Sequence, residues 1–117
     1  MAYNDAMFVL MANAAASAVT HLQLHNGAPG AGYTANVVGT RATTTDSVDA
    51  DGDVTHSASF TGLPANQPVT HISYWSAATN GSNYGGAALN TTPPNDASAN
   101  GAGELTVTAV ETSSAGA

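Results

Sequence analysis

The chain has 117 residues and a formal charge of −7, with eight acidic residues, a single arginine (Arg41) and no lysine. Nucleic acids and anionic membrane surfaces need several cations to neutralise phosphates, so this composition excludes both as direct partners. The absence of cysteine excludes a disulfide scaffold and a cysteine-based metal site. No apolar run approaches the ~18 residues that a membrane-spanning helix needs.

The apolar core is expected to be thin. Leu, Ile, Val and Phe make up about 15% of the chain, below the ~20% at which a self-sufficient core becomes doubtful. Charged residues are also few, so the highly charged pattern of disordered chains does not fit. We therefore expect one domain, residues 1–117, that completes its burial by self-association, as a trimer.

Residues 3–18 are predicted to form a helix, with Asn4 as N-cap and Asp5 near the positive end of the helix dipole. A stripe at helical spacing consists of Met7, Leu10, Met11, Ala14 and Ala18. Phe8 and Val9 fall off this stripe. Either the helix is buried on more than one side, or its second apolar patch meets another subunit, which makes Met7, Phe8, Val9 and Met11 candidate interface residues. A secretory signal is a third interpretation, weakened by the missing basic n-region.

Residues 68–78 hold the only tryptophan and the only isoleucine between two turn-forming segments, which predicts a strand. Side chains alternate along a strand, so Ile72 and Tyr74 share one face, and Ser73 and Trp75 the other. Large groups on both faces indicate a central strand, or one covered by a neighbouring subunit. Trp75 is therefore also a candidate interface residue.

Residues 19–24 match residues 69–74 in type at every position. We expect two equivalent core strands that pair or lie in facing sheets. Leu22 and Leu24 then point one way, and His21, Gln23 and His25 form a polar face. On a strand the two histidines are about 13 Å apart, too far to bind one metal ion.

Residues 36–44 also read as a strand, and they contain Arg41. The structural interpretation is an ion pair or a clamp on backbone carbonyls, and the functional one is a ligand contact.

Residues 46–53 concentrate negative charge at Asp46, Asp49, Asp51 and Asp53. The spacing fails the EF-hand template, so a hairpin with a type I′ turn at Asp51-Gly52 is favoured, and a bound cation stays open. Residues 54–60 alternate as a strand with one apolar face, which holds His56 as a hydrogen-bonded core histidine.

Beyond residue 78 we expect a loop at 80–86, a short strand at 87–90, a long polar segment at 91–103, a final strand at 104–110 and a polar tail at 111–117. The predicted fold is mainly β: an antiparallel β-sandwich or small barrel (residues 19–110) with one N-terminal helix. No nucleophile elbow, phosphate-binding loop or pair of close carboxylates is present, so we expect no enzyme, no catalytic residues, no cofactor and no metal.

Several short motifs resemble one family. They are an Ala-rich helix, Thr-His-Leu-Gln-Leu-His-Asn-Gly-Ala-Pro-Gly (20–30), Gly-Thr-Arg (39–41), Val-Thr-His-Ile-Ser-Tyr-Trp-Ser-Ala (69–77) and Gly-Glu-Leu-Thr-Val (103–107). This pattern resembles small tailed-phage virion proteins of the tail-fibre-like or minor tail type. Gln23 and Ser73 depart from it, because they stand where the family pattern has glycine.

The resemblance implies a non-enzymatic building block, made in the host cytoplasm and located on the virion, with other tail proteins as partners. One alternative is a capsid decoration protein that braces the major capsid protein of the head. A second is a glycan-binding module for the host surface, in which Tyr33, Tyr74, Tyr84 and Trp75 stack on sugar rings.

Overall fold

The computed structural model describes residues 4–89 and 97–111, which form one helix and nine strands. The elements are α1 (Asp5–Ala18), β1 (His21–His25), β2 (Val37–Thr43), β3 (Thr45–Val48), β4 (Val54–Phe60), β5 (Pro68–Val69), β6 (His71–Trp75), β7 (Asn83–Ala88), β8 (Ala97–Ser98) and β9 (Leu105–Glu111).

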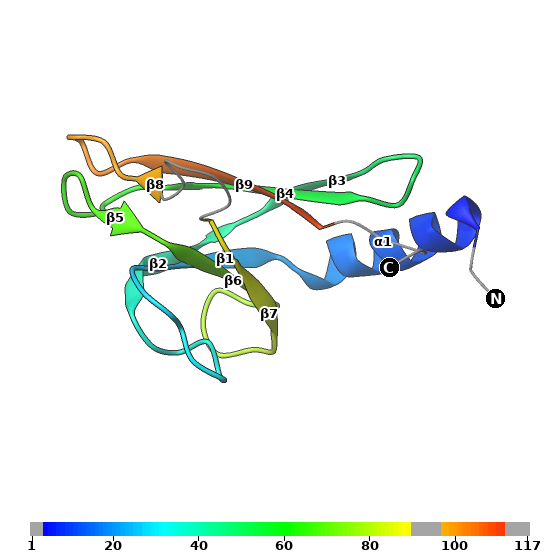
Figure 1. Cartoon of the computed structure of the whole chain (residues 1–117), viewed down its shortest axis with the longest axis horizontal. Coiled ribbons are helices and arrows are strands. Elements are labelled where there is room, and N and C mark those ends of the chain that lie inside the picture. Colours follow the sequence, from blue (N-terminus) through cyan, green and yellow to red (C-terminus); the bar gives the residue numbers. More distant parts are fainter. Residues whose placement is uncertain (1–3, 90–96, 112–117) are drawn as a thin grey trace.

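The strands form a four-stranded sheet in the order β2-β1-β6-β7, a three-stranded sheet in the order β3-β4-β9 and the pair β5-β8. Every pairing is antiparallel. The two larger sheets lie as layers, and α1 extends from one end beside the β3–β4 hairpin (Figure 1). The predicted fold class, mainly β and antiparallel with one N-terminal helix, is confirmed.

The apolar core lies between the two layers. It includes Leu22 and Leu24 of β1, Ile72 of β6, and Phe60 of β4, which are all at most 3% exposed. Strand β4 alternates between buried and partly exposed positions, as its sequence predicts. β2 and β3 are separated by Thr44 alone, so this segment leaves one sheet and enters the other almost without interruption.

The two matching sequence segments are neighbouring strands. β1 and β6 pair side by side, with Gln23 opposite Ser73 at the centre, so the first of the two expected arrangements is correct. Each strand is preceded by a threonine whose hydroxyl hydrogen-bonds Nδ1 of the following histidine: Thr20 with His21 at 2.9 Å, and Thr70 with His71 at 2.8 Å. The sequence match therefore reflects a local two-fold relation between the central strands.

Helix α1 begins as predicted, because the Asn4 side chain accepts a hydrogen bond from the backbone N–H of Met7 at 3.1 Å. It packs on the β3–β4 hairpin and buries Phe8 and Ala12. Phe8 is 7% exposed, so this predicted interface residue lies inside its own chain. In the part of the chain that the structure describes, no helix has the length and apolar character to cross a bilayer.

The hairpin between β3 and β4 forms where it is predicted, but its turn is not type I′. Only Gly52 has a positive φ, of +85°, and the N–H of Gly52 donates to the carbonyl of Asp49 at 3.2 Å. This is a three-residue loop that ends in a left-handed glycine. The Asp49 carboxylate accepts the N–H groups of Asp51 and Asp53, both at 2.9 Å, which closes the loop.

The same loop occurs a second time at residues 100–104. The Asn100 side chain accepts the N–H groups of Ala102 and Glu104, and Gly103 has a φ of +78°. Both glycines are tightly packed: a Cβ on Gly52 would lie 2.6 Å from Cβ of Phe8, and one on Gly103 would overlap the carbonyl oxygen of Leu63. The two loops therefore fix the hairpin against α1 and β9 against the 61–67 segment.

Other predicted boundaries change. β7 begins at Asn83, inside the segment expected to be a loop, and ends at Ala88. β8 lies within the segment expected to be polar loop, where it pairs with β5. Glu111, the first residue of the expected tail, belongs to β9. Residue 3 of the predicted helix, residue 90 of the predicted 87–90 strand, and residues 91–96 and 112–117 lie outside the described residues.

Candidate functional site

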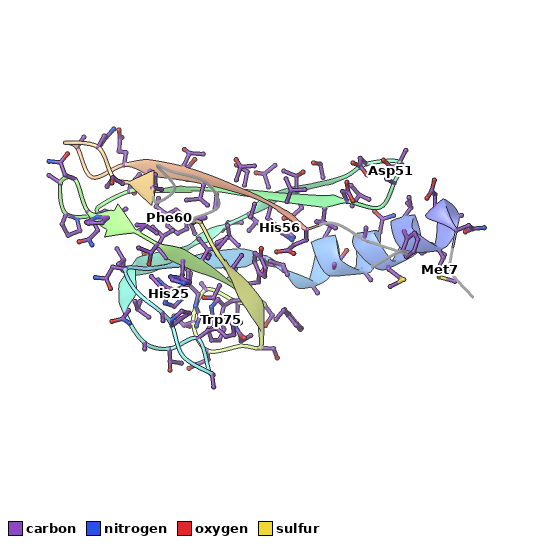
Figure 2. All side chains as sticks on the ribbon, viewed as in Figure 1. Met7, His25, Asp51, His56, Phe60 and Trp75 are labelled. Atoms are coloured by element: carbon purple, nitrogen blue, oxygen red, sulfur yellow. The ribbon has the colours of Figure 1, made fainter. Side chains whose placement is uncertain are left out.

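One face of α1 is apolar and exposed. We define the helix stripe as Met7, Leu10 and Met11, whose side chains are 38%, 64% and 48% exposed. Figure 2 places Met7 on the outer side of the helix, away from the sheets. Asp5 is the only charged residue of the helix. The helix stripe is therefore an uncharged surface on a strongly acidic chain, and two of the predicted interface residues, Met7 and Met11, lie on it.

Trp75, another predicted interface residue, is covered by its own chain. It is 7% exposed, and the guanidinium carbon of Arg41 lies 3.7 Å from the centre of a Trp75 ring. The Arg41 side chain also donates from one nitrogen to the carbonyls of Ala77 at 3.0 Å and Asn80 at 2.7 Å. Arg41 thus holds the 76–82 loop over the tryptophan.

Arg41 makes the backbone clamp that the sequence analysis offered, and the described residues hold no ion pair of Arg41. Within residues 4–89 and 97–111 the only salt bridge joins His56 to Asp46. The acidic groups are concentrated on the β3–β4 hairpin, and the stacked ring and two carbonyls satisfy the guanidinium instead. A cation–π contact of this kind contributes about 0.5–2 kcal/mol.

A buried polar network lies on the side of β1 and β6 that faces away from β4 and β9 (Figure 2). Ser73 Oγ is 2.7 Å from Trp75 Nε1 and 2.7 Å from His25 Nε2, and His25 Nδ1 is 2.8 Å from the carbonyl oxygen of Ala35. The carbonyl can only accept, so Nδ1 of His25 carries the proton. Trp75 therefore donates to Ser73, Ser73 to His25, and His25 to Ala35, and every group in the network is paired.

This network corrects the expected polar face. Gln23 is 6% exposed and His25 and Ser73 are fully buried, because the loops at 26–36 and 76–82 cover this side of the sheet. Gln23 Nε2 lies 3.1 Å from the carbonyl oxygen of Val38 and 3.3 Å from that of Gly39, at the bulge between β1 and β2. Ser73 has no exposed surface, so its hydrogen bond with His25 is a buried contact. This contact supports the packing of the sheet.

Burial, with a smaller contribution from His71, lowers the pKa of His25 below its ordinary value, against the opposing hydrogen bond to Ala35. The unfolded chain binds a proton at His25 near pH 6.5, where the folded chain still does not. Stability is therefore expected to fall as the pH drops below about 6.5, by at most about 1.4 kcal/mol per pH unit from this group. Urea unfolding at pH 7.5, 6.5 and 5.5 measures this slope.

The matched variant is His25→Asn, which keeps a donor for the Ala35 carbonyl and removes the titrating ring. It should be less stable than the wild type at pH 7.5 and should show a shallower loss towards pH 5.5. Identical slopes in the two proteins would contradict the assignment.

His56 lies between the layers and is 2% exposed, in agreement with the predicted hydrogen-bonded core histidine (Figure 2). Its Nδ1 is 2.5 Å from Oδ1 of Asp46, the residue opposite it on β3. The Thr44 hydroxyl, 3.0 Å from Oδ2 of Asp46, supports the other carboxylate oxygen. Asp46 is thus held in the inter-sheet region and does not belong to the group of aspartates at the hairpin turn.

A cavity of about 380 Å³ opens beside this pair, where the end of α1 meets β4, β6, β7 and β9. Its wall includes three tyrosines, Tyr33, Tyr74 and Tyr84, together with His56 and Glu111. The Tyr74 hydroxyl donates to the Glu111 carboxylate, and burial together with this hydrogen bond raises the pKa of Tyr74. The Tyr74 and His56 ring centres are 5.4 Å apart.

Sequence reasoning did not find this cavity. Tyr33, Tyr74 and Tyr84 were expected to stack on sugars together with Trp75, but Trp75 lies on the opposite side of the sheet, under Arg41. His56 and Glu111 come from β4 and β9, and nothing in their spacing links them to the tyrosines. Only the pairing of distant strands brings the group together.

The carboxylates of Asp49, Asp51 and Asp53 offer oxygen atoms within 4.8 Å of one another, so the open question of a cation concerns these three residues. However, Asp49 already accepts two backbone N–H groups that shape the turn. The turn therefore accounts for Asp49 without an ion.

Comparisons with protein-family models, with curated proteins and with solved structures find no match for this chain.

Proposed function

We propose that this protein is a non-enzymatic structural component of a tailed-phage particle, a small tail-fibre-like or minor tail protein that assembles as a homo-oligomer, as a trimer, through helix α1. The proposal rests on the helix stripe. Its three side chains, Met7, Leu10 and Met11, are 38–64% exposed, and none of them is charged. Large apolar side chains gathered on one exposed face are typical of surfaces that another protein covers.

Charge favours α1 as the meeting surface. With a formal charge of −7, copies of this chain repel one another over most faces. The four aspartates 46, 49, 51 and 53 lie on the hairpin behind the helix, and the helix carries a negative charge only at Asp5. Contact between helix stripes therefore buries apolar surface without burying carboxylates.

The purified full chain is expected to be a trimer at micromolar concentration in light scattering coupled to size-exclusion chromatography. The double variant Leu10→Gln/Met11→Gln should shift the mass to that of a monomer of 11.5 kDa, because it removes most of the apolar stripe while keeping helix propensity.

The control is Val37→Gln, which changes an apolar side chain with a similar exposed fraction, 48%, on β2. It should leave the mass unchanged. A cooperatively folded wild-type monomer at micromolar concentration, or equal loss of association in both variants, would contradict assembly through α1.

The capsid decoration role is the competing placement on the particle, and the helix stripe suits it equally, because the stripe could rest on the head lattice. Labelled protein located on purified tails would support the tail assignment, and labelling confined to heads would reject it. The resemblance to virion proteins rests on the short motifs at 20–30, 39–41, 69–77 and 103–107.

A further inference from the structure

The tyrosine-lined cavity described above has a wall chemistry that differs from that of an ordinary gap between sheets. Its three tyrosines come from three separate parts of the chain: Tyr33 from the loop after β1, Tyr74 from β6 and Tyr84 from β7. Tyr84 is 52% exposed and stands at the surface, whereas Tyr74 is 5% exposed. The rings therefore line the cavity at more than one depth.

Glycines keep this space open. Gly85 and Gly86 of β7 line the cavity, and no heavy atom lies within 4 Å of the position that a Cβ on Gly85 would take. At Gly86 the space is taken by Tyr33, whose ring lies 2.5 Å from a Cβ built there. The missing side chains thus admit the Tyr33 ring against the strand and leave the neighbouring volume free.

The electrostatic environment of the cavity is negative. The Glu111 carboxylate lines the cavity, and Asp46 lies behind His56. Arg41, the only arginine or lysine of the chain, lies on the other face of the four-stranded sheet over Trp75. No basic side chain of Lys or Arg type therefore balances the carboxylate from within the cavity, and a positively charged guest is favoured over an anion.

The hydrogen bonds already made in the cavity also favour one class of ligand over another. The Tyr74 hydroxyl is already donated to Glu111, and Nδ1 of His56 is already paired with Asp46. A sugar is recognised by free donors and acceptors as well as by ring stacking, and here the buried polar groups are largely committed to one another. A quaternary ammonium needs no hydrogen bond, because aromatic faces and a nearby negative charge attract it.

We propose that this cavity is a binding site for a quaternary ammonium group of the choline type, held by the rings of Tyr33, Tyr74 and Tyr84 and by the charge of Glu111. The volume, about 380 Å³, lies in the range of small-molecule pockets. This proposal does not depend on assembly through α1, so the two can fail separately.

The test uses the full-length protein at pH 8 and low ionic strength, titrated with choline chloride and, in parallel, with its neutral isostere 3,3-dimethylbutan-1-ol. Tyrosine ring resonances in NMR report binding. Choline is expected to bind in the millimolar range and about tenfold more tightly than the isostere, a ratio typical of a cation–π site.

Three variants assign the binding to this cavity. Glu111→Gln keeps an acceptor for Tyr74 and removes the charge, so choline affinity should fall about fivefold or more while isostere affinity is unchanged. Tyr84→Ala should weaken choline binding, and Tyr84→Phe, which keeps the ring, should preserve it. Because Tyr84 is half exposed, both Tyr84 variants should fold, and circular dichroism checks this.

Three results would overturn the proposal: equal affinities for choline and the isostere, no binding of choline at 50 mM, or choline binding unaffected by Glu111→Gln. Binding of methyl glucoside that depends on Tyr84, without choline binding, would replace it with the glycan interpretation.

Discussion

Gly103→Ala is expected to destabilise the fold by about 3 kcal/mol or more, a large part of the total stability of a domain of this size. Gly103 has a φ of +78°, where a side chain costs about 1–2 kcal/mol. A Cβ there would also overlap the carbonyl oxygen of Leu63, and the Leu63 N–H donates to the Gly103 carbonyl at 3.1 Å. Thermal unfolding should show a drop in Tm of more than about 10 °C.

Two nearby glycines separate the cost of backbone strain at a positive φ from the cost of the steric overlap with Leu63. Gly101 lies in the same loop without a positive φ, and a Cβ there meets nothing within 4 Å, so Gly101→Ala should be nearly neutral. Gly62 has a φ of +71° and open space around it, so Gly62→Ala reports the backbone strain alone. If Gly103→Ala costs no more than Gly62→Ala, the close approach to Leu63 contributes nothing and the packing described here is wrong.

Ser73→Ala is expected to cost about 2–5 kcal/mol, although the two side chains have almost the same volume. The Ser73 hydroxyl is both the acceptor for Trp75 Nε1 and the partner of His25 Nε2, each at 2.7 Å. Its removal leaves two buried polar groups unpaired, and each such group costs about 1–3 kcal/mol. Chemical denaturation measures the loss, and the indole N–H of Trp75 should exchange with solvent faster in NMR.

Ser57→Ala is the matched control. Ser57 also sits mid-strand and contacts a hydroxyl, that of Thr108 at 3.3 Å, but this contact is exposed to water. The control should change stability by less than about 0.5 kcal/mol. A cost below 1 kcal/mol for Ser73→Ala would mean that water replaces the hydroxyl and that the network does not support the sheet.

Period-two alternation correctly predicted β4 and the apolar faces of β1 and β6, because large apolar residues such as Phe60 and Ile72 alternate with smaller or polar ones and are buried in the core between the layers. The match between residues 19–24 and 69–74 also anticipated two equivalent strands, which prove to be paired. The alternation of apolar and polar residues along a strand marks its buried face, so this part of the fold can be recognised from the sequence.

The other side of the four-stranded sheet could not be predicted in the same way. His25, Gln23 and Ser73 look like a solvated polar face, and they become buried because two loops fold over them. Those loops are held by single long-range contacts, such as that of Arg41 to the carbonyls of Ala77 and Asn80. No periodic signal encodes such contacts, since they join residues more than 35 positions apart.

The helix shows a related limit. Helical spacing alone predicted one apolar stripe through Met7, Leu10 and Met11 and placed Phe8 outside it. However, Phe8 is the residue that packs on Gly52. Both faces of the helix are apolar, so its orientation depends on which face fits the hairpin. The glycine at the hairpin turn lets the backbone and Cβ of Phe8 approach closely. The cavity escaped prediction for the same reason, because Tyr33, His56 and Glu111 meet only through tertiary pairing.

The short junction between α1 and β1 has a mechanical consequence. Only two residues separate the helix from the strand, so tension applied to the helix passes directly along β1 (Figure 1). β1 runs between β2 and β6, and antiparallel ladder bonds lie across the strand direction. Pulling on the helix therefore shears many of these bonds at once and does not peel them open one by one, so a molecule fastened by its helix would resist extraction by force.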